Sequence, residues 1–429
     1  MFKASTATVN LTPDDPLWLA GYAARTAPAK GKISDLCATV LALEDSNGQR
    51  FVILSADLIA LPRQITEPIV EAVRARTGLP RDRMLFAASH THYGPEFRPD
   101  KELFFNIPPQ YGAKILPTAA KITGALTRVM LAALEQPFEP VRLFARKSRA
   151  GFAHNRRRGG VKDGQASRED VLDNDVPVLD VVDATTGQPK AILFGYACHN
   201  TTIPPEDLRY CADWAGFAKQ QLQEALPGAS ALFITGAGAD QNPEPRGSVE
   251  LSQQYGREIA DAVQQSLNGD GIEITGAIRS AMEDCDLALQ PATKDLLEQK
   301  LSSDDFPIRR KAQFLLDQLA RGEPLITSYP APLQAIRFGE QLLMCVMSGE
   351  PVVDWAHQFK REFANKARIV WVAGYCNDMY GYVPTRRVQL EGGYEGGRAN
   401  LWSWVPSPWT DDVEDRITAS MHRLVAKVS

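Results

Sequence analysis

The sequence predicts an α/β protein in which a mixed β-sheet core is flanked by helices. Short apolar runs of strand length alternate along the chain with longer stretches whose apolar residues recur at helical spacing. Such alternation is typical of a sheet that is covered by helices. The chain has 429 residues, of which 44% are hydrophobic, so it can bury a large core.

The predicted strands are apolar runs bounded by polar or glycine-containing segments. They cover residues 38–43, 51–56, 84–88, 177–182, 191–198, 231–235, 334–347 and 368–373. The predicted helices cover residues 67–77, 114–135, 215–226, 249–267 and 306–320. No linker rich in Pro, Gly and Ser and no internal repeat divides this order, so we expect one continuous domain over residues 1–429.

Two segments between the predicted elements have the composition of long loops. Residues 146–175 are rich in Arg, Gly and Asp, and residues 392–408 are rich in Gly, Trp and Pro. Long loops in compact domains tend to act as lids or binding loops. We therefore expect both segments to contribute to function.

Charge and composition exclude several classes of protein. The 47 basic and 52 acidic residues give a net charge of −5 without a long run of either sign, so we expect no nucleic-acid partner and no membrane partner. Residues 1–19 contain no apolar segment behind a basic start, so no signal peptide is predicted and the cytoplasm is the expected location. The six cysteines show no C-x-x-C spacing and are expected to be buried thiols. The sequence does not predict an oligomeric state.

Three of the six histidines stand at the ends of two apolar runs. His90 and His92 follow the run 84–88, and His199 follows the run 191–198. Residues i and i+2 of a strand point to the same side, so His90 and His92 could face one cavity. Neutral imidazole is the commonest transition-metal ligand, and the pattern therefore predicts a metal site. The alternative is a set of core histidines that are bonded to backbone carbonyl groups.

Polar residues also follow other apolar runs. Glu350 comes after the run 342–349 and before a helical stretch, so its carboxylate either points into a cleft or interacts with the start of that helix. Tyr382 and Tyr394 lie beside glycines, which allow close approach of the backbone. For both tyrosines, simple packing is the alternative to a role in catalysis.

The loop 235–244 gathers four polar residues after a predicted strand, where an α/β protein typically exposes its working groups. These residues are Asp240, Gln241, Asn242 and Glu244. The glycines of the loop do not form a nucleotide-binding signature, because the Lys-Ser/Thr of a P-loop and a full dinucleotide fingerprint are both missing. A Gly-x-Ser-x-Gly elbow, the commonest sign of a Ser-His-Asp hydrolase, is missing too.

Taken together, these motifs resemble the N-terminal catalytic domain of neutral (alkaline, non-lysosomal) ceramidases, which are zinc-dependent amidases. The matching segments are 9–13, 19–22, 55–57, 89–92, 155–156, 197–199, 348–350, 382–385 and 394–396. The step of twelve residues from Tyr382 to Tyr394 agrees with the spacing of the two functional tyrosines in that family. The resemblance spans most of the chain, and we expect no counterpart of the C-terminal Ig-like β-sandwich domain of full-length ceramidases.

The resemblance implies a catalytic centre with one Zn²⁺ per chain. Its implied metal ligands are His90, His199, Glu350 and Tyr382. The resemblance further implies that His92 lies next to these ligands or faces the substrate, and that Arg156 and Tyr394 hold the scissile group or stabilise the charge that develops on it. This ligand set leaves a position for water, which the metal would acidify while polarising the bond to be cleaved.

The loop 235–244 departs from the family pattern, in which a serine lies in a Gly-Asp-x-Ser-Pro-Asn segment. Gln241 aligns with that serine and cannot act as a nucleophile or base, whereas Asp240 could orient or deprotonate a water molecule. Ceramide is therefore not the expected substrate. The residues expected to contact a small polar substrate are Asn155, Asn242, Glu244 and Trp402.

Three functions remain open at this point. The leading hypothesis is a zinc-dependent hydrolase that uses metal-activated water, with Asp240 as general base, on an amide or related acyl bond. The second is a zinc-dependent glycosidase or other carbohydrate-active enzyme, in which Asp240 or Glu244 acts as acid or base and Trp402, Trp404 and Trp409 stack on sugar rings. The third is a non-catalytic zinc-containing protein that binds a small ligand.

Overall fold

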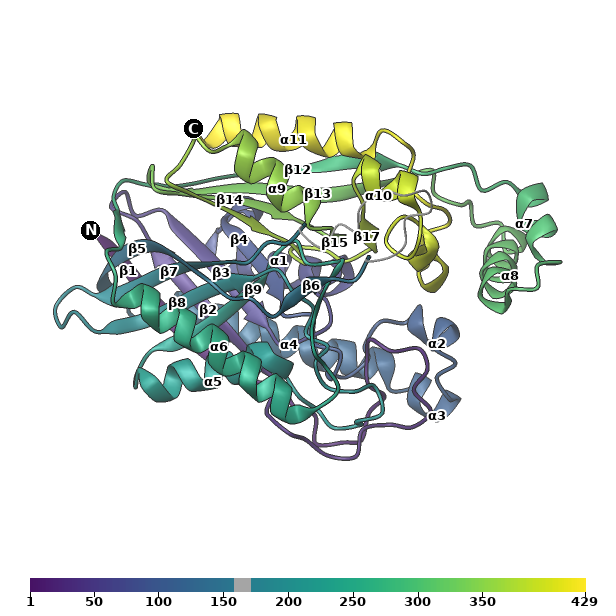
Figure 1. Ribbon diagram of the computed structural model, residues 1–429, viewed down its shortest axis with the longest axis horizontal. Coiled ribbons are helices and arrows are strands. Elements are labelled where there is room, and N and C mark those ends of the chain that lie inside the picture. Colours follow the sequence, from purple (N-terminus) through teal and green to yellow (C-terminus); the bar gives the residue numbers. More distant parts are fainter. Residues whose placement is uncertain (158–170) are drawn as a thin grey trace.

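The computed structural model describes residues 1–157 and 171–429. Two β-sheets are stacked face to face, and helices cover the outer face of each sheet (Figure 1). The apolar core between the sheets joins Leu41 and Leu193 of the larger sheet to Ile336 and Met344 of the smaller one. The structure thus confirms the α/β class that the sequence predicts.

The larger sheet has nine strands in the order β4-β3-β2-β1-β5-β7-β8-β9, with β11 also paired to β5. Their bounds are β1 (Phe2–Asn10), β2 (Cys37–Glu44), β3 (Arg50–Ala56), β4 (Met84–Ala88), β5 (Glu139–Arg149), β7 (Asp175–Asp183), β8 (Pro189–Tyr196), β9 (Ser230–Thr235) and β11 (Ile272–Ile274). The pairs β3–β4 and β8–β9 are parallel, and the other pairs are antiparallel, so the sheet is mixed.

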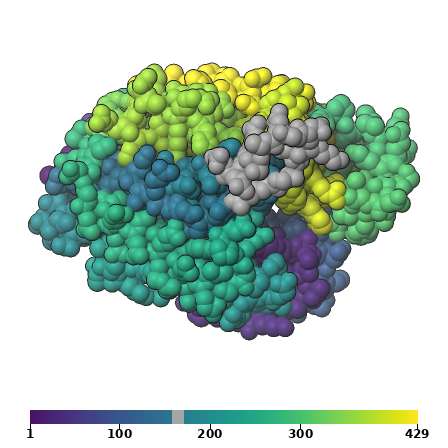
Figure 2. All heavy atoms as spheres, viewed as in Figure 1, coloured from purple at the N-terminus to yellow at the C-terminus, as the bar shows by residue number. Residues whose placement is uncertain are grey.

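The strands β2, β3, β4, β8 and β9 of the larger sheet are buried on both faces, which explains their apolar sequence runs. Val40 and Ala42 of β2 pack against helices on the outer face, whereas Leu41 and Leu43 face the smaller sheet. The helices on the outer face are α1 (Arg63–Thr77), α4 (Ile115–Glu135), α5 (Asp213–Ala225) and α6 (Val249–Leu267). Figure 2 shows α5 and α6 in teal on the lower part of one face of the molecule, with the yellow C-terminal segments at its top.

The smaller sheet has the strand order β12-β13-β14-β16. Its elements are β12 (Ile278–Ala288), β13 (Ser328–Phe338), β14 (Leu342–Met347) and β16 (Ile369–Ala373), with α9 (Asp354–Glu362) and α11 (Val413–Val428) on the outer face. The prediction of one strand over residues 334–347 is wrong, because the chain turns between β13 and β14. Gly339 adopts a φ of +54°, which favours glycine and permits this turn.

The two outermost strands of the larger sheet, β4 and β9, approach each other, and side-chain hydroxyls bridge the gap. The hydroxyl of Ser55, at the end of β3, donates a hydrogen bond of 2.6 Å to the carbonyl of Phe233 in β9 and accepts one of 3.1 Å from its N–H. Thr235 in β9 donates to the carbonyl of Ala88 in β4 at 3.0 Å. The sheet therefore curls, and the segments that follow β4, β8 and β9 are brought together.

Two short strand pairs extend from this junction. The strand β6 (Ala153–Asn155) pairs with β10 (Gln241–Pro243), and β15 (Glu350–Pro351) pairs with β17 (Tyr382–Val383). The prediction of a loop over residues 146–175 is wrong at two points, since β5 continues to residue 149 and β6 lies within the predicted loop. Residues 158–170 of that loop lie outside the described residues. The predicted loop 392–408 contains the short helix η2 (Arg398–Trp402).

The remaining helices are short or lie at the edge of the molecule: α2 (Lys101–Phe104), α3 (Pro109–Gly112), α7 (Lys294–Lys300), α8 (Phe306–Ala320) and α10 (Arg386–Glu391). All six cysteines are free thiols; five are buried and Cys37 is half-buried, as the sequence largely predicts. None of the helices in the described residues is long and apolar enough to cross a membrane.

A buried ion pair joins the end of β3 to α5, and we expect it to matter for stability. Lys219 is 2.6 Å from a carboxylate oxygen of Asp57, and both side chains are less than a tenth exposed. We predict that Lys219→Met lowers the free energy of unfolding by about 3–5 kcal/mol, because it leaves a buried charge without a partner. Urea titration would measure the loss.

Lys3→Met is the matched control for this prediction. Lys3 also pairs with a carboxylate, that of Glu44 at 2.9 Å, but its side chain is half-exposed. Its loss should change the stability by about 1 kcal/mol or less. Equal urea midpoints for the two variants would contradict the account of the Asp57–Lys219 pair.

Candidate metal centre

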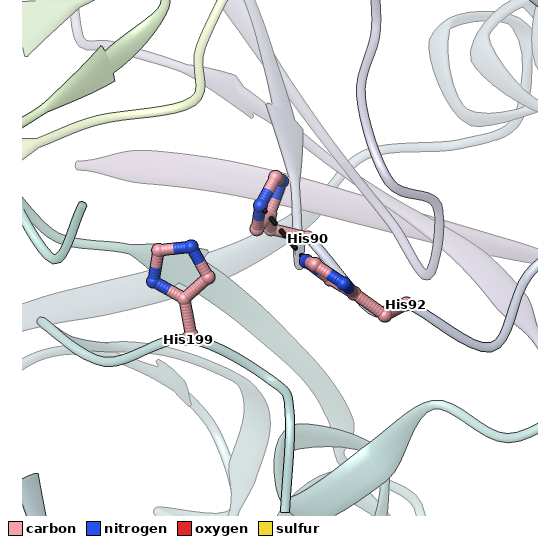
Figure 3. Close-up of side chains that lie close together, drawn as sticks. All are labelled: His90, His92 and His199. Carbon is pink, nitrogen blue, oxygen red and sulfur yellow. Dashed lines mark hydrogen bonds between the residues drawn. The ribbon is translucent and has the colours of Figure 1, made fainter. Parts of the chain in front are cut away.

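Three imidazoles from two parallel strand pairs meet at one end of the larger sheet. His90 and His92 follow β4, and His199 follows β8 (Figure 3). The carboxyl ends of parallel strands are a common place for functional sites in α/β proteins. Strand alternation is not what brings His90 and His92 together, because β4 ends at Ala88 and His90 adopts a φ of +61°. A turn therefore aims the two rings at each other.

The three rings are close enough to share one ion. One nitrogen of each of His90, His92 and His199 lies within 4.8 Å of the corresponding nitrogens of the other two. The Nε2 atoms of His90 and His92 are 3.3 Å apart. The structure thus brings together the three histidines that the sequence singles out as a metal site.

Backbone carbonyl groups fix the tautomers of two of the three rings. The Nδ1 of His90 lies 2.7 Å from the carbonyl oxygen of Ile59, and the Nδ1 of His199 lies 2.9 Å from that of Gly238. A carbonyl oxygen only accepts hydrogen bonds, so each Nδ1 carries the proton and each Nε2 keeps its lone pair. Histidines that bind metals are usually oriented in this way. His92 differs, since its Nδ1 is buried without a partner among the described residues.

Glu350 completes the cluster with a carboxylate. Its Oε2 lies 3.4 Å from Nε2 of His90 and 3.6 Å from Nε2 of His199. Burial alone would raise the pKa of Glu350, but the nearby His90, His199 and Arg156 lower it to about 2. Burial lowers the pKa of His90 to about 4, so at neutral pH the neutral imidazole of His90 faces the carboxylate anion of Glu350.

This arrangement fits a bound divalent cation. Neither Oε2 of Glu350 nor Nε2 of His199 has a hydrogen-bond partner in the described part of the chain, although both atoms are buried. Buried polar atoms are nearly always paired, and here lone pairs face one another without a proton between them. Two imidazole nitrogens and a carboxylate oxygen are a donor set that Zn²⁺ prefers at catalytic sites.

Tyr382 lies beside Glu350 and is held by an arginine. The two residues are partners in the β15–β17 pair, and the hydroxyl of Tyr382 accepts a hydrogen bond of 3.0 Å from Arg156. The other two nitrogens of Arg156 donate to Glu395 at 2.7 Å and to Asn242 at 3.4 Å. Burial raises the pKa of Tyr382 well above its usual value. The position of Tyr382 agrees with the implied ligand set, and its role as a ligand stays a prediction.

Asp240 and Gln241 are close to the centre in the chain but are occupied by the protein scaffold. The carboxylate of Asp240 accepts hydrogen bonds from the N–H of Val353 at 2.8 Å and from the amide of Asn155 at 3.0 Å. Burial raises its pKa to about 6. The side chain of Gln241 donates to the carbonyl of Ala197 and accepts from the N–H of Asp173 at 3.1 Å. Both side chains therefore anchor backbone segments around His199 and Glu350.

A cavity of about 870 Å³ opens beside the cluster. The predicted site residues that line it are His90, His92, Glu350, Tyr382, Tyr394 and Trp402. Those that do not line it are Asn155, Arg156, His199, Asp240, Gln241, Asn242 and Glu244. Glu244 is exposed. Of the three tryptophans considered for stacking, Trp404 lines the cavity together with Trp402, while Trp409 is buried and donates to the carbonyl of Tyr382 at 2.9 Å.

Most of the cavity wall is apolar. Helices α1 and α4 contribute one side, and the segments around β4 and η2 contribute the other. The apolar lining residues are Ile59, Pro62, Ile65, Pro68, Phe97, Phe105, Leu116, Ala119, Ala120, Met379, Trp402 and Trp404. A wall of this kind favours a ligand with a sizeable apolar part.

The structure also brings three residues to the site that the sequence reasoning missed. Glu395 is buried and binds both Arg156 and Arg157 at 2.7 Å. Tyr375 packs its ring 4.5 Å from that of His90, and its buried hydroxyl has no partner among the described residues. Arg98 lines the cavity. Tyr375 follows a predicted strand, as His90 does, so the rule that located the histidines would also have located Tyr375.

Comparison with solved structures identifies the fold. The chain is similar to the neutral ceramidase from Pseudomonas aeruginosa, with a TM-score of 0.78, 18% sequence identity and coverage of 99% of this chain and 74% of that one. It is also similar to a ceramidase complexed with C2, with a TM-score of 0.75, 19% identity and coverage of 100% and 76%. No protein-family model and no curated protein sequence matches the chain. The fold is therefore neutral-ceramidase-like, as the sequence motifs predict.

We predict that the purified protein binds one zinc ion per chain and that His90→Ala and His199→Ala each lower the affinity for zinc by more than about 100-fold. Partners of metal ligands alone contribute about 10–100-fold, so loss of a ligand should cost more. Elemental mass spectrometry after dialysis against zinc and then buffer would measure the occupancy.

His422→Ala is the control for the metal measurement. His422 is half-exposed and bonds to Glu362 at 2.8 Å, remote in sequence from the other three imidazoles. This variant should keep the zinc content of the wild type. Full occupancy in both His90→Ala and His199→Ala would refute the ligand assignment.

Proposed function

We propose that the protein is a zinc-dependent hydrolase that cleaves an amide or related acyl bond. One observation carries this proposal: Nε2 of His199 and Oε2 of Glu350 are buried 3.6 Å apart without a hydrogen-bond partner among the described residues, and Glu350 lines a large cavity. The neutral-ceramidase-like fold supports it, since two solved structures to which the chain is similar are ceramidases.

His90, His199 and Glu350 would hold the ion, with Tyr382 beside them. When bound, the ion supplies Lewis acidity that activates water and polarises the carbonyl group of a substrate. The backbone carbonyls of Ile59 and Gly238 keep the two imidazoles in the tautomer that leaves Nε2 free for the metal.

His92 is the group best placed to move a proton. Its ring lines the cavity, and no backbone carbonyl fixes its tautomer. Burial lowers its pKa well below the usual value, so at neutral pH the ring is uncharged. In the proposed reaction His92 accepts a proton at Nε2 from the attacking water and passes it to the leaving nitrogen.

We assign to the phenols of Tyr382 and Tyr394 the part of donors to the carbonyl oxygen as negative charge develops on it. Both residues line the cavity, and their ring centroids are 5.3 Å apart. Arg156 does not line the cavity and donates to the hydroxyl of Tyr382, so we assign it the part of a positioning residue that acts through Tyr382. Asp240 is likewise a positioning residue, because its carboxylate holds the backbone of Val353. Since Asp240 does not line the cavity and His92 does, we assign the role of the base to His92 in place of Asp240.

The cavity also changes the substrate that we propose. A small polar substrate is expected from the sequence, but the wall of apolar side chains favours a substrate with an extended hydrocarbon part. Trp402 and Trp404 supply the aromatic faces that the carbohydrate hypothesis requires. Most of the exposed wall is apolar, however, and such a wall matches a hydrocarbon chain better than a row of sugar hydroxyls, so the acyl substrate is favoured.

A panel of substrates with the same hydrocarbon chain tests the proposal. We predict zinc-dependent cleavage of an N-dodecanoyl amide and a dodecanoyl ester, and no cleavage of a dodecyl glycoside, as measured by product release. Chelation should abolish activity, and added zinc should restore it. Cleavage of the glycoside alone would favour the carbohydrate hypothesis. Binding of these compounds without any cleavage would favour the non-catalytic hypothesis.

Two substitutions separate the proposed roles of His92 and Asp240. We predict that His92→Gln keeps the zinc and lowers kcat by about 100-fold or more, because proton transfer is impaired. Asp240→Asn replaces one acceptor oxygen by an NH₂ group, which then faces the N–H of Val353 or the amide of Asn155. This substitution should lower the free energy of unfolding by about 1–3 kcal/mol. Kinetics and urea titration of both variants provide the measurements. Unchanged stability of Asp240→Asn with a similar loss of kcat would return the role of the base to Asp240.

A further inference from the structure

The cavity wall contains one arginine that the proposed reaction does not use. Arg98 follows the histidine motif in the chain and lines the cavity together with His90, His92 and Glu350. Its side chain is only 13% exposed. A guanidinium in such a position keeps its charge, so it must be paired and bonded.

One edge of the guanidinium is fixed by Glu96. The Nε and Nη2 of Arg98 donate to the two carboxylate oxygens of Glu96 at 2.8 and 2.7 Å. Glu96 is itself fixed, because one of its oxygens also accepts hydrogen bonds from the N–H groups of Phe97 at 3.1 Å and Arg98 at 3.0 Å. This two-bond geometry holds the arginine in one orientation before any ligand arrives.

The third nitrogen of Arg98, Nη1, has no partner among the described residues. Two other cations near the cavity already have protein partners at every nitrogen. Lys101 donates to Asp100 at 2.7 Å and to the carbonyl of Trp402 at 2.6 Å, and each of the three nitrogens of Arg156 donates one hydrogen bond. Nη1 of Arg98 is not enclosed by protein, so it is open to the cavity. Arg98 thus offers a fixed cationic donor to a ligand.

Charge limits what this donor can bind. The ion pairs Arg98–Glu96 and Lys101–Asp100 each have a net charge of zero, and Glu350 is an anion. A group with a single negative charge gains a charge-assisted hydrogen bond, whereas a second charge on the ligand would be repelled by these carboxylates.

We propose that Arg98 binds a carboxylate of the substrate through Nη1, and that the substrate is an N-acyl amino acid. The inference rests on the proposed function. The acyl chain lies along the apolar wall, the amide faces His90 and Glu350, and the carboxylate on the amine side reaches Arg98. Hydrolysis adds the oxygen of water to the carbonyl carbon, breaks the C–N bond and leaves a proton on the nitrogen, so the products are a fatty acid and an amino acid.

Ligands that cannot be cleaved test the Arg98 subsite separately from catalysis. The first ligand is a ketone analogue of N-dodecanoylglycine, in which a methylene replaces the amide nitrogen. The second is the same ketone with a neutral carboxamide in place of the carboxylate. Calorimetry with the zinc-loaded protein should show that the acid binds about tenfold more tightly or better, the value expected for a charge-assisted hydrogen bond.

Arg98→Met should remove this preference and leave the affinity for the neutral ligand unchanged. Because this variant leaves Glu96 without its partner, the double variant Glu96→Gln, Arg98→Met provides a second measurement without a buried charge. Arg142→Met is the matched control, since Arg142 is half-exposed and pairs with Glu273 at 2.8 Å on the surface. The control should keep the preference for the acid.

The proposal is overturned if the wild-type protein binds the two ligands equally or binds neither of them. It is also overturned if the folded double variant still binds the acid more tightly than the carboxamide. Turnover of N-dodecanoylglycine is measured separately. A preference that depends on Arg98 without turnover supports the subsite and refutes the hydrolase. Turnover of acyl amides without the preference supports the hydrolase and refutes the subsite.

Discussion

The site depends on the closure between the outermost strands of the larger sheet. The hydroxyl of Ser55 both donates to and accepts from the backbone of Phe233, and Thr235 donates to the carbonyl of Ala88. These bonds satisfy backbone groups that a regular ladder would pair, so β4 and β9 can end side by side without buried unpaired groups. His90 follows one of these strands. Gly238, whose carbonyl orients His199, follows the other.

Closure also explains why a polar centre can exist inside an apolar molecule. His90 and His199 are buried, and a backbone carbonyl orients each of them, while the partly buried carboxylate of Glu350 lies 3.4 and 3.6 Å from their Nε2 atoms. The wall of the cavity beside them is mostly apolar. In such surroundings the electrostatic interactions between the metal ligands, the phenols and a substrate are stronger than in water.

The sequence predicts the parts of the fold that are buried on both faces. The strands β2, β3, β4 and β8 read as continuous apolar runs because helices cover one face and the second sheet covers the other. The strand β12 and the helix α11 were missed, because each has an exposed polar face that interrupts its apolar pattern. The histidines could be located from their positions at strand ends. Glu395 could not be located from the sequence, because its partner, Arg156, is 239 residues away in the chain. Arg98 could not be located either, because its proposed role depends on a cavity that only the fold creates.

The central claim is that His90, His199 and Glu350 hold a catalytic metal ion at the wall of the apolar cavity. Anomalous diffraction from crystals of the zinc-loaded protein, recorded at the zinc absorption edge, tests it most directly. The account predicts one strong peak within coordination distance of Nε2 of His90, Nε2 of His199 and Oε2 of Glu350. A peak at another position, or no peak despite saturating zinc, would contradict it.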